Sequence, residues 1–155
     1  MFDIIEARQN DLEMLVGLRL AFFEHINEPL IQEEHVHMIK QRLKEYFTAH
    51  LEQDDFVALL ARAENEIAGT VFLTVYEMPA HTALLTGKTG TILNVLVLPK
   101  YQRLGLATQM IQKIISIAKE RDLSAVNLSA TPAGAPLYKK LGFIPSKYEY
   151  MRLFL

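Results

Sequence analysis

Three stretches of the chain carry apolar residues at a helical spacing. Between residues 12 and 22 they recur every three or four positions, and Asn10 or Asp11 just before them is a residue type that often caps a helix. Residues 33–52 repeat the pattern with charged residues in between, which is typical of an amphipathic helix. Residues 106–118 have a broader apolar stripe and predict a helix packed on a sheet. A fourth, short helix is expected around Leu137, Tyr138 and Leu141.

Alternating or continuous apolar runs predict strands elsewhere. The predicted strands are residues 4–7, 56–62, 67–76, 91–98, 125–129 and 147–155. The short polar turn at 64–66 joins two of them as a hairpin. The run 91–98 suits a central strand covered on both faces, with Asn94 as its polar exception. Strict alternation would place Asn94 on the same face as Ile92 and Leu96.

The order of these elements predicts one mixed α/β domain over residues 1–155. Half of the 155 residues are apolar, so a sizeable core is expected, and no repeat, linker or low-complexity segment divides the chain. The formal net charge of −2 gives no general attraction to nucleic acid or to an anionic membrane. No apolar run is long enough to span a membrane, and the N-terminus has no signal-peptide pattern. We therefore expect a soluble cytoplasmic protein that binds neither nucleic acid nor membrane.

The residue types available limit the chemistry. The chain has no cysteine, which excludes a thiolate metal site and a Cys acyl-enzyme. His35 and His37 are two positions apart in a predicted helix, so they point to different faces and cannot hold one metal ion together. No metal site is expected.

The most informative segment is the turn at residues 101–108, between the strand 91–98 and the helix 106–118. The first N–H groups of a helix have no intrahelical acceptor and lie at the positive end of the helix dipole, so they favour a phosphate group. Gly105 and Ala107 leave room for such a ligand. The patterns of a Walker loop and of a dinucleotide-binding loop are both missing. By itself the turn also fits an ordinary strand-to-helix connection.

Two motifs together resemble a known family. The turn reads Gln-x-x-Gly-x-Ala at 102–107, and some thirty residues later the chain reads Leu-Tyr-x-x-x-Gly-Phe at 137–143. This pair resembles the acyl-CoA signature and the C-terminal motif of the GNAT N-acetyltransferase superfamily. The resemblance implies a central mixed, mostly antiparallel twisted sheet of about six to seven strands with about four helices, in which the fourth and fifth strands splay apart.

The resemblance also assigns the cofactor-binding residues. Acetyl-CoA would lie between the splayed strands, its pantetheine arm pairing with the main chain of Leu96, Val97 and Leu98. Its pyrophosphate would accept hydrogen bonds from the turn residues Gln102, Arg103, Leu104, Gly105, Leu106 and Ala107, with Thr108 adding a hydroxyl. Many relatives place an Asn where this chain has Thr131, so that contact is expected to differ here.

Tyr138 is the expected catalytic acid. A phenol keeps its proton at neutral pH and can give it to a CoA thiolate, whose thiol resembles that of Cys in pKa. Some family members carry a Glu on the fourth strand, where this chain has Asn94, and an amide can orient an amine or a water but cannot act as a base. Glu77, at the end of the strand 67–76, is the nearest carboxylate by topology, with Glu24 and His25 as weaker candidates.

The implied function is direct transfer of an acetyl group from acetyl-CoA to a primary amine in a ternary complex. The amine, a small molecule or a peptide, is not identified by the sequence. The connection 78–90 and the first two helices are expected to line its pocket. Two alternatives remain: a non-catalytic acyl-CoA sensor, and a structural domain without a ligand. The apolar segment 147–155 is also suited to pairing across a homodimer.

Overall fold

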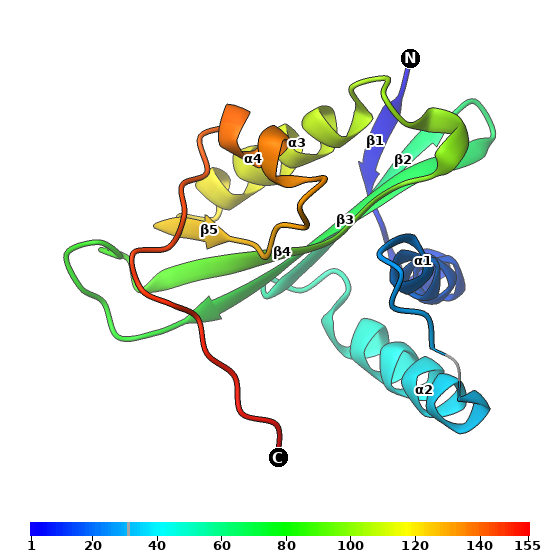
Figure 1. Cartoon of the computed structure of the whole chain (residues 1–155), viewed down its shortest axis with the longest axis horizontal. Coiled ribbons are helices and arrows are strands. Elements are labelled where there is room, and N and C mark those ends of the chain that lie inside the picture. The colour runs from blue at the N-terminus through cyan, green and yellow to red at the C-terminus, as the bar shows by residue number, and fades with distance from the viewer. Residues whose placement is uncertain (31) are drawn as a thin grey trace.

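The computed structural model describes residues 1–30 and 32–155 and shows one sheet between two helical layers (Figure 1). Strands β1 (Asp3–Glu6), β2 (Phe56–Ala63), β3 (Glu66–Glu77) and β4 (Lys88–Val97) pair antiparallel in sequence order. Strand β5 (Ala125–Asn127) adds to β4 in parallel. The mixed, mostly antiparallel α/β architecture is therefore confirmed.

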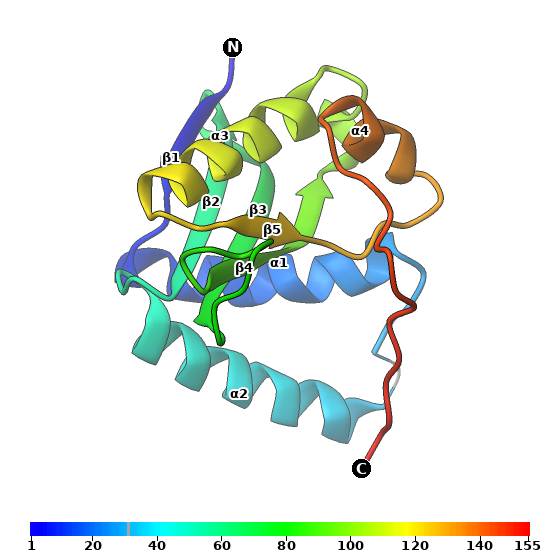
Figure 2. The same ribbon diagram turned by 90° about the vertical axis from the view of Figure 1, so that its left-hand side faces the viewer.

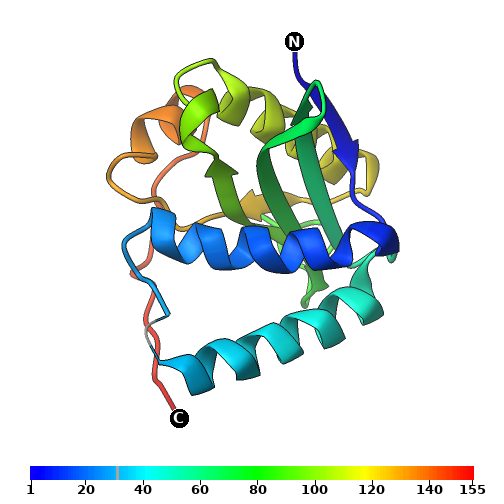
Figure 3. The ribbon, with the colours of Figure 1, turned by 90° about the vertical axis from the view of Figure 1, so that its right-hand side faces the viewer.

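Helices cover both faces of this sheet. Helix α3 (Leu106–Glu120) and the short α4 (Ala135–Lys140) lie on one face, and α1 (Leu12–His25) and α2 (Glu33–His50) lie on the other (Figures 2 and 3). Two short 3-10 turns, Gln9–Asp11 and Pro99–Tyr101, precede α1 and α3. None of the described helices has the length and apolarity that a membrane span requires.

The sheet has a hydrophobic core on each face, and the side chains of β2 alternate between them. Val57, Leu59 and Ala61 face α3, whereas Phe56 and Leu60 face α1 and α2. Because successive strand residues point to opposite faces, an almost wholly apolar strand supplies both cores at once. The second core contains the aromatic rings that seat α2 on the sheet, Phe47, Phe56 and Phe72, with ring centroids 5.6 to 5.8 Å apart.

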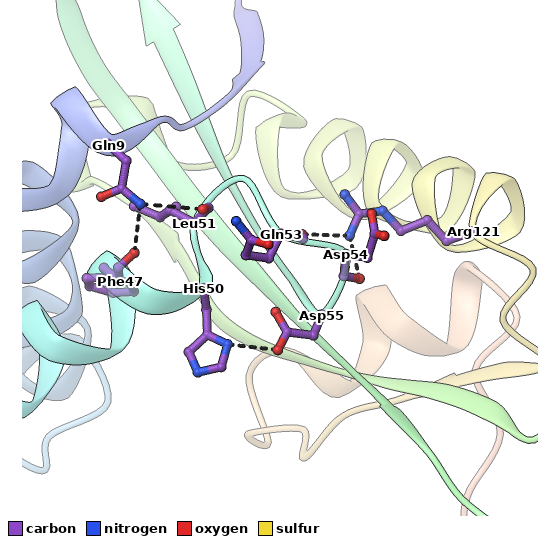
Figure 4. Close-up of polar contacts among 8 residues, drawn as sticks. All are labelled: Gln9, Phe47, His50, Leu51, Gln53, Asp54, Asp55 and Arg121. Atoms are coloured by element: carbon purple, nitrogen blue, oxygen red, sulfur yellow. Dashed lines mark hydrogen bonds and ion pairs between the residues drawn. The ribbon is translucent and has the colours of Figure 1, made fainter.

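The link between α2 and β2 is held from both sides of the sheet (Figure 4). Nε2 of Gln9 donates to the carbonyl oxygens of Phe47 and Leu51, at 3.3 and 3.4 Å. The guanidinium of Arg121, just after α3, donates to the carbonyl oxygen of Asp54 at 2.8 Å. These contacts fix the end of α2 against the start of the central strands.

The predicted sixth strand is wrong for the described structure. Residues 147–155 form an extended tail without strand pairing, and the described sheet has five strands instead of about six to seven. A strand sequence needs a neighbouring edge for its N–H and C=O groups, and the tail leaves the body of the molecule (Figure 1). The tail's alternation therefore has no partner within the described chain.

Strands β4 and β5 pair over only three residues. The pairs run from Thr89 with Ala125 to Thr91 with Asn127. Beyond Thr91, β4 continues along β3 alone among the described strands, because β5 ends. The two strands thus part in the direction of the turn at 101–108.

Candidate functional site

The turn before α3 presents unpaired backbone donors. Gly105 has a φ of 79°, and Arg103 before it also has a positive φ, 62°. Within the described residues, the N–H groups from Arg103 to Thr108 donate no hydrogen bond. A Cβ added to Gly105 would have no heavy atom within 4 Å, so the space in front of these amides is open. The turn therefore offers a set of amides at the positive end of a helix, as an anion site requires.

Side chains fix this turn to the sheet. Nε2 of Gln102 donates to the carbonyl oxygen of Val97 at 3.2 Å, which joins the turn to the end of β4. Lys100 and the hydroxyl of Tyr101 both reach Oε2 of Glu66, at 2.7 and 2.6 Å. The hydrogen bond from Lys100 is the main reason that the pKa of Glu66 is lowered. Lys100 is thus engaged with β3.

Tyr138 lies on α4 with its ring packed against the turn that precedes it. Its ring is only 9% exposed and meets the ring of Phe143 edge to face at a centroid distance of 5.8 Å. Gly134 is the residue beneath it, since a Cβ there would lie 3.0 Å from Cε2 of Tyr138. Burial raises the pKa of the Tyr138 phenol above its ordinary value, so the hydroxyl holds its proton at neutral pH.

Thr131 begins the segment that leads into α4. Its hydroxyl and carbonyl oxygens both accept from the N–H of Gly134, at 3.2 and 3.0 Å, and its carbonyl also accepts from Ala135 at 2.9 Å. The hydroxyl is thereby engaged in the turn that carries Tyr138. Thr131 therefore lines the site and stabilises the turn that leads into α4.

One cavity of about 350 Å³ brings most of these groups together. It lies between the end of β4, the turn and α4. Among the predicted residues it is lined by Val97, Gln102, Arg103, Gly105, Leu106, Ala107, Thr108, Thr131 and Tyr138. We call it the cradle cavity. Leu104 is absent from the lining and is 59% exposed.

A second cavity, of about 460 Å³, lies on the α1 side of β4. Leu96 and Leu98 line it together with Glu24 and His25 of α1. His25 lines the cradle cavity as well. The end of β4 therefore separates two cavities that share His25 as a wall.

Comparison with known proteins decides the family. The model of the acetyltransferase (GNAT) family matches residues 19–143. The chain belongs to the GNAT family. This range includes the turn, Tyr138 and the whole of β2 to β5.

Relatives and solved structures agree with this membership. A provisionally named acetyltransferase of Bacillus subtilis is 27% identical over 134 residues, which are 86% of this chain and 81% of that protein. An N-alpha-acetyltransferase of Sulfurisphaera tokodaii is 28% identical over 109 residues, 63% of this chain and 62% of that protein. The crystal structure of a predicted acetyltransferase of Clostridium acetobutylicum with acetyl-CoA has a TM-score of 0.89 and 27% identity, covering 99% of this chain and 96% of that one.

Asn94 departs from the face predicted for it in this GNAT chain. It is 1% exposed and has a φ of 56°, within a register irregularity between β3 and β4. This bulge inserts one extra residue, so Ile92 packs in the α3 core while Leu96 packs in the α1 core. Asn94 therefore points toward α1, on the side of Leu96 and not of Ile92.

Glu77 lies away from both cavities. It is the last residue of β3 and pairs with Lys88 at the start of β4, whereas the cradle cavity is at the other end of that strand. Val97 lies nine positions beyond Lys88 along extended chain, about 30 Å at 3.3 Å per residue. The prediction that Glu77 is the nearest carboxylate to the site is thus wrong in position.

Arg19 lines neither of these two cavities but contacts Asn94, and the sequence pattern did not single it out. From α1 its Nη1 donates to Oδ1 of Asn94 at 3.2 Å, and its guanidinium lies over Phe23, 4.7 Å from the ring centroid. The signal was available, because Arg19 stands between Leu18 and Leu20 in the apolar stretch of this helix. A charged residue there must find a partner inside the fold. Among the described residues, no cluster of three His, Asp or Glu side chains is arranged to hold a metal ion.

Proposed function

We propose that this GNAT protein transfers an acetyl group from acetyl-CoA to a primary amine by direct attack in a ternary complex. The observation that carries the proposal is the cradle cavity, in which open helix-start amides and a buried Tyr meet the end of a splayed strand. Family membership and the solved relative with acetyl-CoA support the same donor. The absence of cysteine favours direct attack over a Cys acyl-enzyme.

The turn would hold the pyrophosphate of acetyl-CoA. The amides from Arg103 to Thr108 would donate to its oxygens, with Gln102 fixing the turn and the Thr108 hydroxyl adding a donor. The main chain of Leu96, Val97 and Leu98 would bind the pantetheine arm where β4 has lost its β5 neighbour. This arrangement would carry the thioester toward Tyr138.

Tyr138 would act as the general acid. Attack of the neutral amine on the thioester carbonyl forms the C–N bond, and collapse of the tetrahedral intermediate breaks the C–S bond and releases the CoA thiolate. The phenol would give its proton to this sulfur. Because burial raises the pKa of Tyr138, the phenol is protonated at neutral pH and is available to protonate the sulfur as the C–S bond breaks.

His25 is the best-placed group to take the proton that the amine loses. It lines both the cradle cavity and the cavity beside Leu96 and Leu98, and the free nitrogen of a neutral imidazole can accept a proton. Glu24, its neighbour on α1, lines only the second cavity. Asn94 would orient the amine or a water instead, because an amide cannot accept this proton.

A thiol-release assay with a panel of amines tests the reaction. Tyr138→Phe should lower kcat by roughly 100-fold or more with little change in KM for acetyl-CoA, since only the proton donor is lost. Equal kcat values for the two proteins would remove Tyr138 from the mechanism. Binding of CoA without thiol release on any amine would instead identify a non-catalytic acyl-CoA sensor.

A calorimetric titration with CoA tests the cradle. Gly105→Glu would place a carboxylate in front of the free amides and should abolish measurable binding. Glu13→Gln, an exposed change on α1, serves as the matched control and should bind as the wild type does. Unchanged affinity in Gly105→Glu would contradict the phosphate site.

The tail at residues 147–155 would mediate a homodimer. Within the described chain it makes no strand pairing, and its large apolar side chains are exposed. The edge strand of a second copy of the chain would supply hydrogen-bond partners for the backbone of this segment and cover its apolar side chains.

A further inference from the structure

A cleft of about 620 Å³ lies between α1 and α2, separate from the cradle cavity. Its walls carry apolar and aromatic groups from both helices, including Phe23, Ile39, Leu43 and Tyr46. Arg19 also lines this cleft from α1. The cleft thus combines an apolar wall with a guanidinium that is partly removed from water.

Arg19 has no carboxylate partner among the described residues. Its contacts are Oδ1 of Asn94 at 3.2 Å and the rings of Phe22 and Phe23, with centroids at 5.5 and 4.7 Å. A guanidinium carries five N–H donors, and an amide oxygen satisfies only one of them here. Burial lowers the pKa of Arg19 from its ordinary value, but an Arg stays charged in a protein. This cation therefore lacks an anion.

The other charged groups of the cleft are already paired. Nη1 of Arg42 lies 2.9 Å from Oε2 of Glu45, and Nδ1 of His50 lies 2.8 Å from Oδ2 of Asp55. Arg19 is consequently the one cation of the described lining without a carboxylate at hydrogen-bond distance. Half-buried charges are costly unless an opposite charge joins them.

Asn94 adds a second, independent observation. The residue is 1% exposed, and its Nδ2 has no hydrogen-bond partner in the described residues. Buried polar groups without a partner are rare in folded proteins, so each needs a cause. Nδ2 belongs to the same amide group whose oxygen accepts a hydrogen bond from Arg19. Arg19 and Asn94 therefore form one polar pair beside an apolar core.

We propose that Arg19, oriented by Asn94, forms a carboxylate-binding site in this cleft, and that the amine acetylated by this protein carries a carboxylate and an apolar side chain. This proposal rests on the acetyltransferase function and names its acceptor class. The guanidinium, oriented by Oδ1 of Asn94, would bind the carboxylate in the fork geometry that such pairs prefer. The apolar side chain would lie against Leu43 and Phe23.

The position of Asn94 connects this site to the reaction. Asn94 lies in the β4 bulge, and the next residue, Val95, lines the cradle cavity from the opposite face of the strand. A carboxylate held by Arg19 would lie on the α1 side of β4, and the space proposed for the thioester lies on the other side. An amine on the same molecule would approach the thioester around the end of β4, where His25 lines a cavity on each side.

The test compares each amino acid with its amide. Initial rates of thiol release are measured for leucine against leucinamide and for phenylalanine against phenylalaninamide, with wild type, Arg19→Gln and Arg19→Lys. We expect wild type to favour the acids by about 10- to 100-fold in kcat/KM, the range of one charged hydrogen bond. Arg19→Gln should lose this preference, because KM should rise far more for the acids than for the amides. Arg19→Lys should keep part of it.

A matched control and a binding measurement separate the two proposals. Arg8→Gln removes the same charge from an exposed pair with Glu52 and should keep the preference. Binding of N-acetylleucine, which cannot be acetylated again at nitrogen, is followed by thermal shift against N-acetylleucinamide. If N-acetylleucine raises the melting temperature of wild type but not of Arg19→Gln, the carboxylate site is supported even when no amine in the panel is acetylated.

Two results would overturn the carboxylate site. Equal use of acids and amides by wild type, with thiol release intact, would remove the site and leave the acetyltransferase function standing. Equal thermal shifts by the acid in wild type and Arg19→Gln would do the same. Failure of thiol release with every amine, beside an Arg19-dependent shift, would count against the enzyme and not against the site.

Discussion

Nε2 of Gln102 donates to the carbonyl oxygen of Val97 at 3.2 Å and so ties the turn before α3 to the last residue of β4. The backbone between them turns through Pro99–Tyr101 and reaches Arg103 with a positive φ. The Gln102 side chain therefore holds together the two parts of the proposed acetyl-CoA site, the strand that would bind pantetheine and the amides that would bind pyrophosphate.

Gln102→Ala should weaken the binding of CoA without unfolding the protein. The lost bond is exposed, so its net worth is about 0.5 to 1.5 kcal/mol, or roughly a 2- to 10-fold change in Kd. Isothermal calorimetry with CoA measures it. Gln41→Ala, which removes an exposed Gln on α2, is the control and should leave Kd unchanged. Tighter binding in Gln102→Ala would show that the bond competes with the ligand.

Replacing each of two glycines with equally open surroundings by alanine should change the stability of the fold in opposite directions. A Cβ would have no heavy atom within 4 Å at either Gly17 or Gly105. Gly17 lies inside α1, where Ala is favoured by about 0.5 to 1 kcal/mol, so Gly17→Ala should stabilise the fold. Gly105 has a φ of 79°, and Gly105→Ala should cost about 1 to 2 kcal/mol in the free energy of unfolding.

Urea unfolding of the two variants measures both changes. Gly105→Asn provides the control for the backbone argument, because Asn tolerates the left-handed region better than Ala does. Its stability should lie between those of wild type and Gly105→Ala. If Gly105→Ala were as stable as wild type, the left-handed conformation of this turn would be wrong.

The parts of the site that the sequence predicted are those encoded locally. The turn 101–108 and Tyr138 lie in short motifs whose spacing fixes their elements, and the structure brings them to one cavity. Glu77 was misplaced because antiparallel pairing puts the end of β3 beside the start of β4. The face of Asn94 was wrong because a bulge breaks the period of two, and an inserted residue leaves no mark on an apolar run.

Tertiary pairing explains what the sequence could not show. Arg19 gains its role from Asn94, 75 positions away, so no local pattern connects them. The six-strand expectation failed in a similar way, since the segment 147–155 has the alternation of a strand but pairs with neither edge of the described sheet. Sequence patterns predict which segments can pair, and the fold determines whether a partner is present.

The Tyr138 phenol should make stability depend on alkaline pH. Its pKa in the folded state is raised by burial above the ordinary value of 10.0, so the unfolded chain ionises first. The contribution of the neutral phenol is complete below pH 10 and is lost as the pH rises through the folded-state pKa. Wild type should therefore lose more stability between pH 9 and pH 11 than Tyr138→Phe does.

Urea midpoints of the two proteins at pH 8, 9, 10 and 11 check this difference. Tyr148→Phe is the control. Because Tyr148 is 74% exposed, the urea midpoint of this variant should depend on pH as that of wild type does. Parallel curves for wild type and Tyr138→Phe would contradict the buried placement of this phenol.

The exposed tail should cause the protein to associate with itself. Six large side chains between residues 147 and 155 are 74 to 116% exposed, and they are Tyr148, Tyr150, Met151, Leu153, Phe154 and Leu155. No N–H group of this segment donates a backbone hydrogen bond in the described chain. An extended apolar segment that packs on no core and pairs with no strand would be stabilised by pairing with a second copy, which buries the side chains and satisfies the backbone together.

Sedimentation velocity over a range of concentrations measures this association. The full chain should form dimers at micromolar concentrations, and a variant that ends at residue 146 should stay monomeric with an unchanged fold, because the removed segment contacts little of it. The double variant Leu153→Asp, Phe154→Asp keeps the length of the tail and should also be monomeric, since charge at these positions opposes burial. A full chain and a truncated chain that both sediment as monomers at every concentration would show that the tail does not bind a second copy.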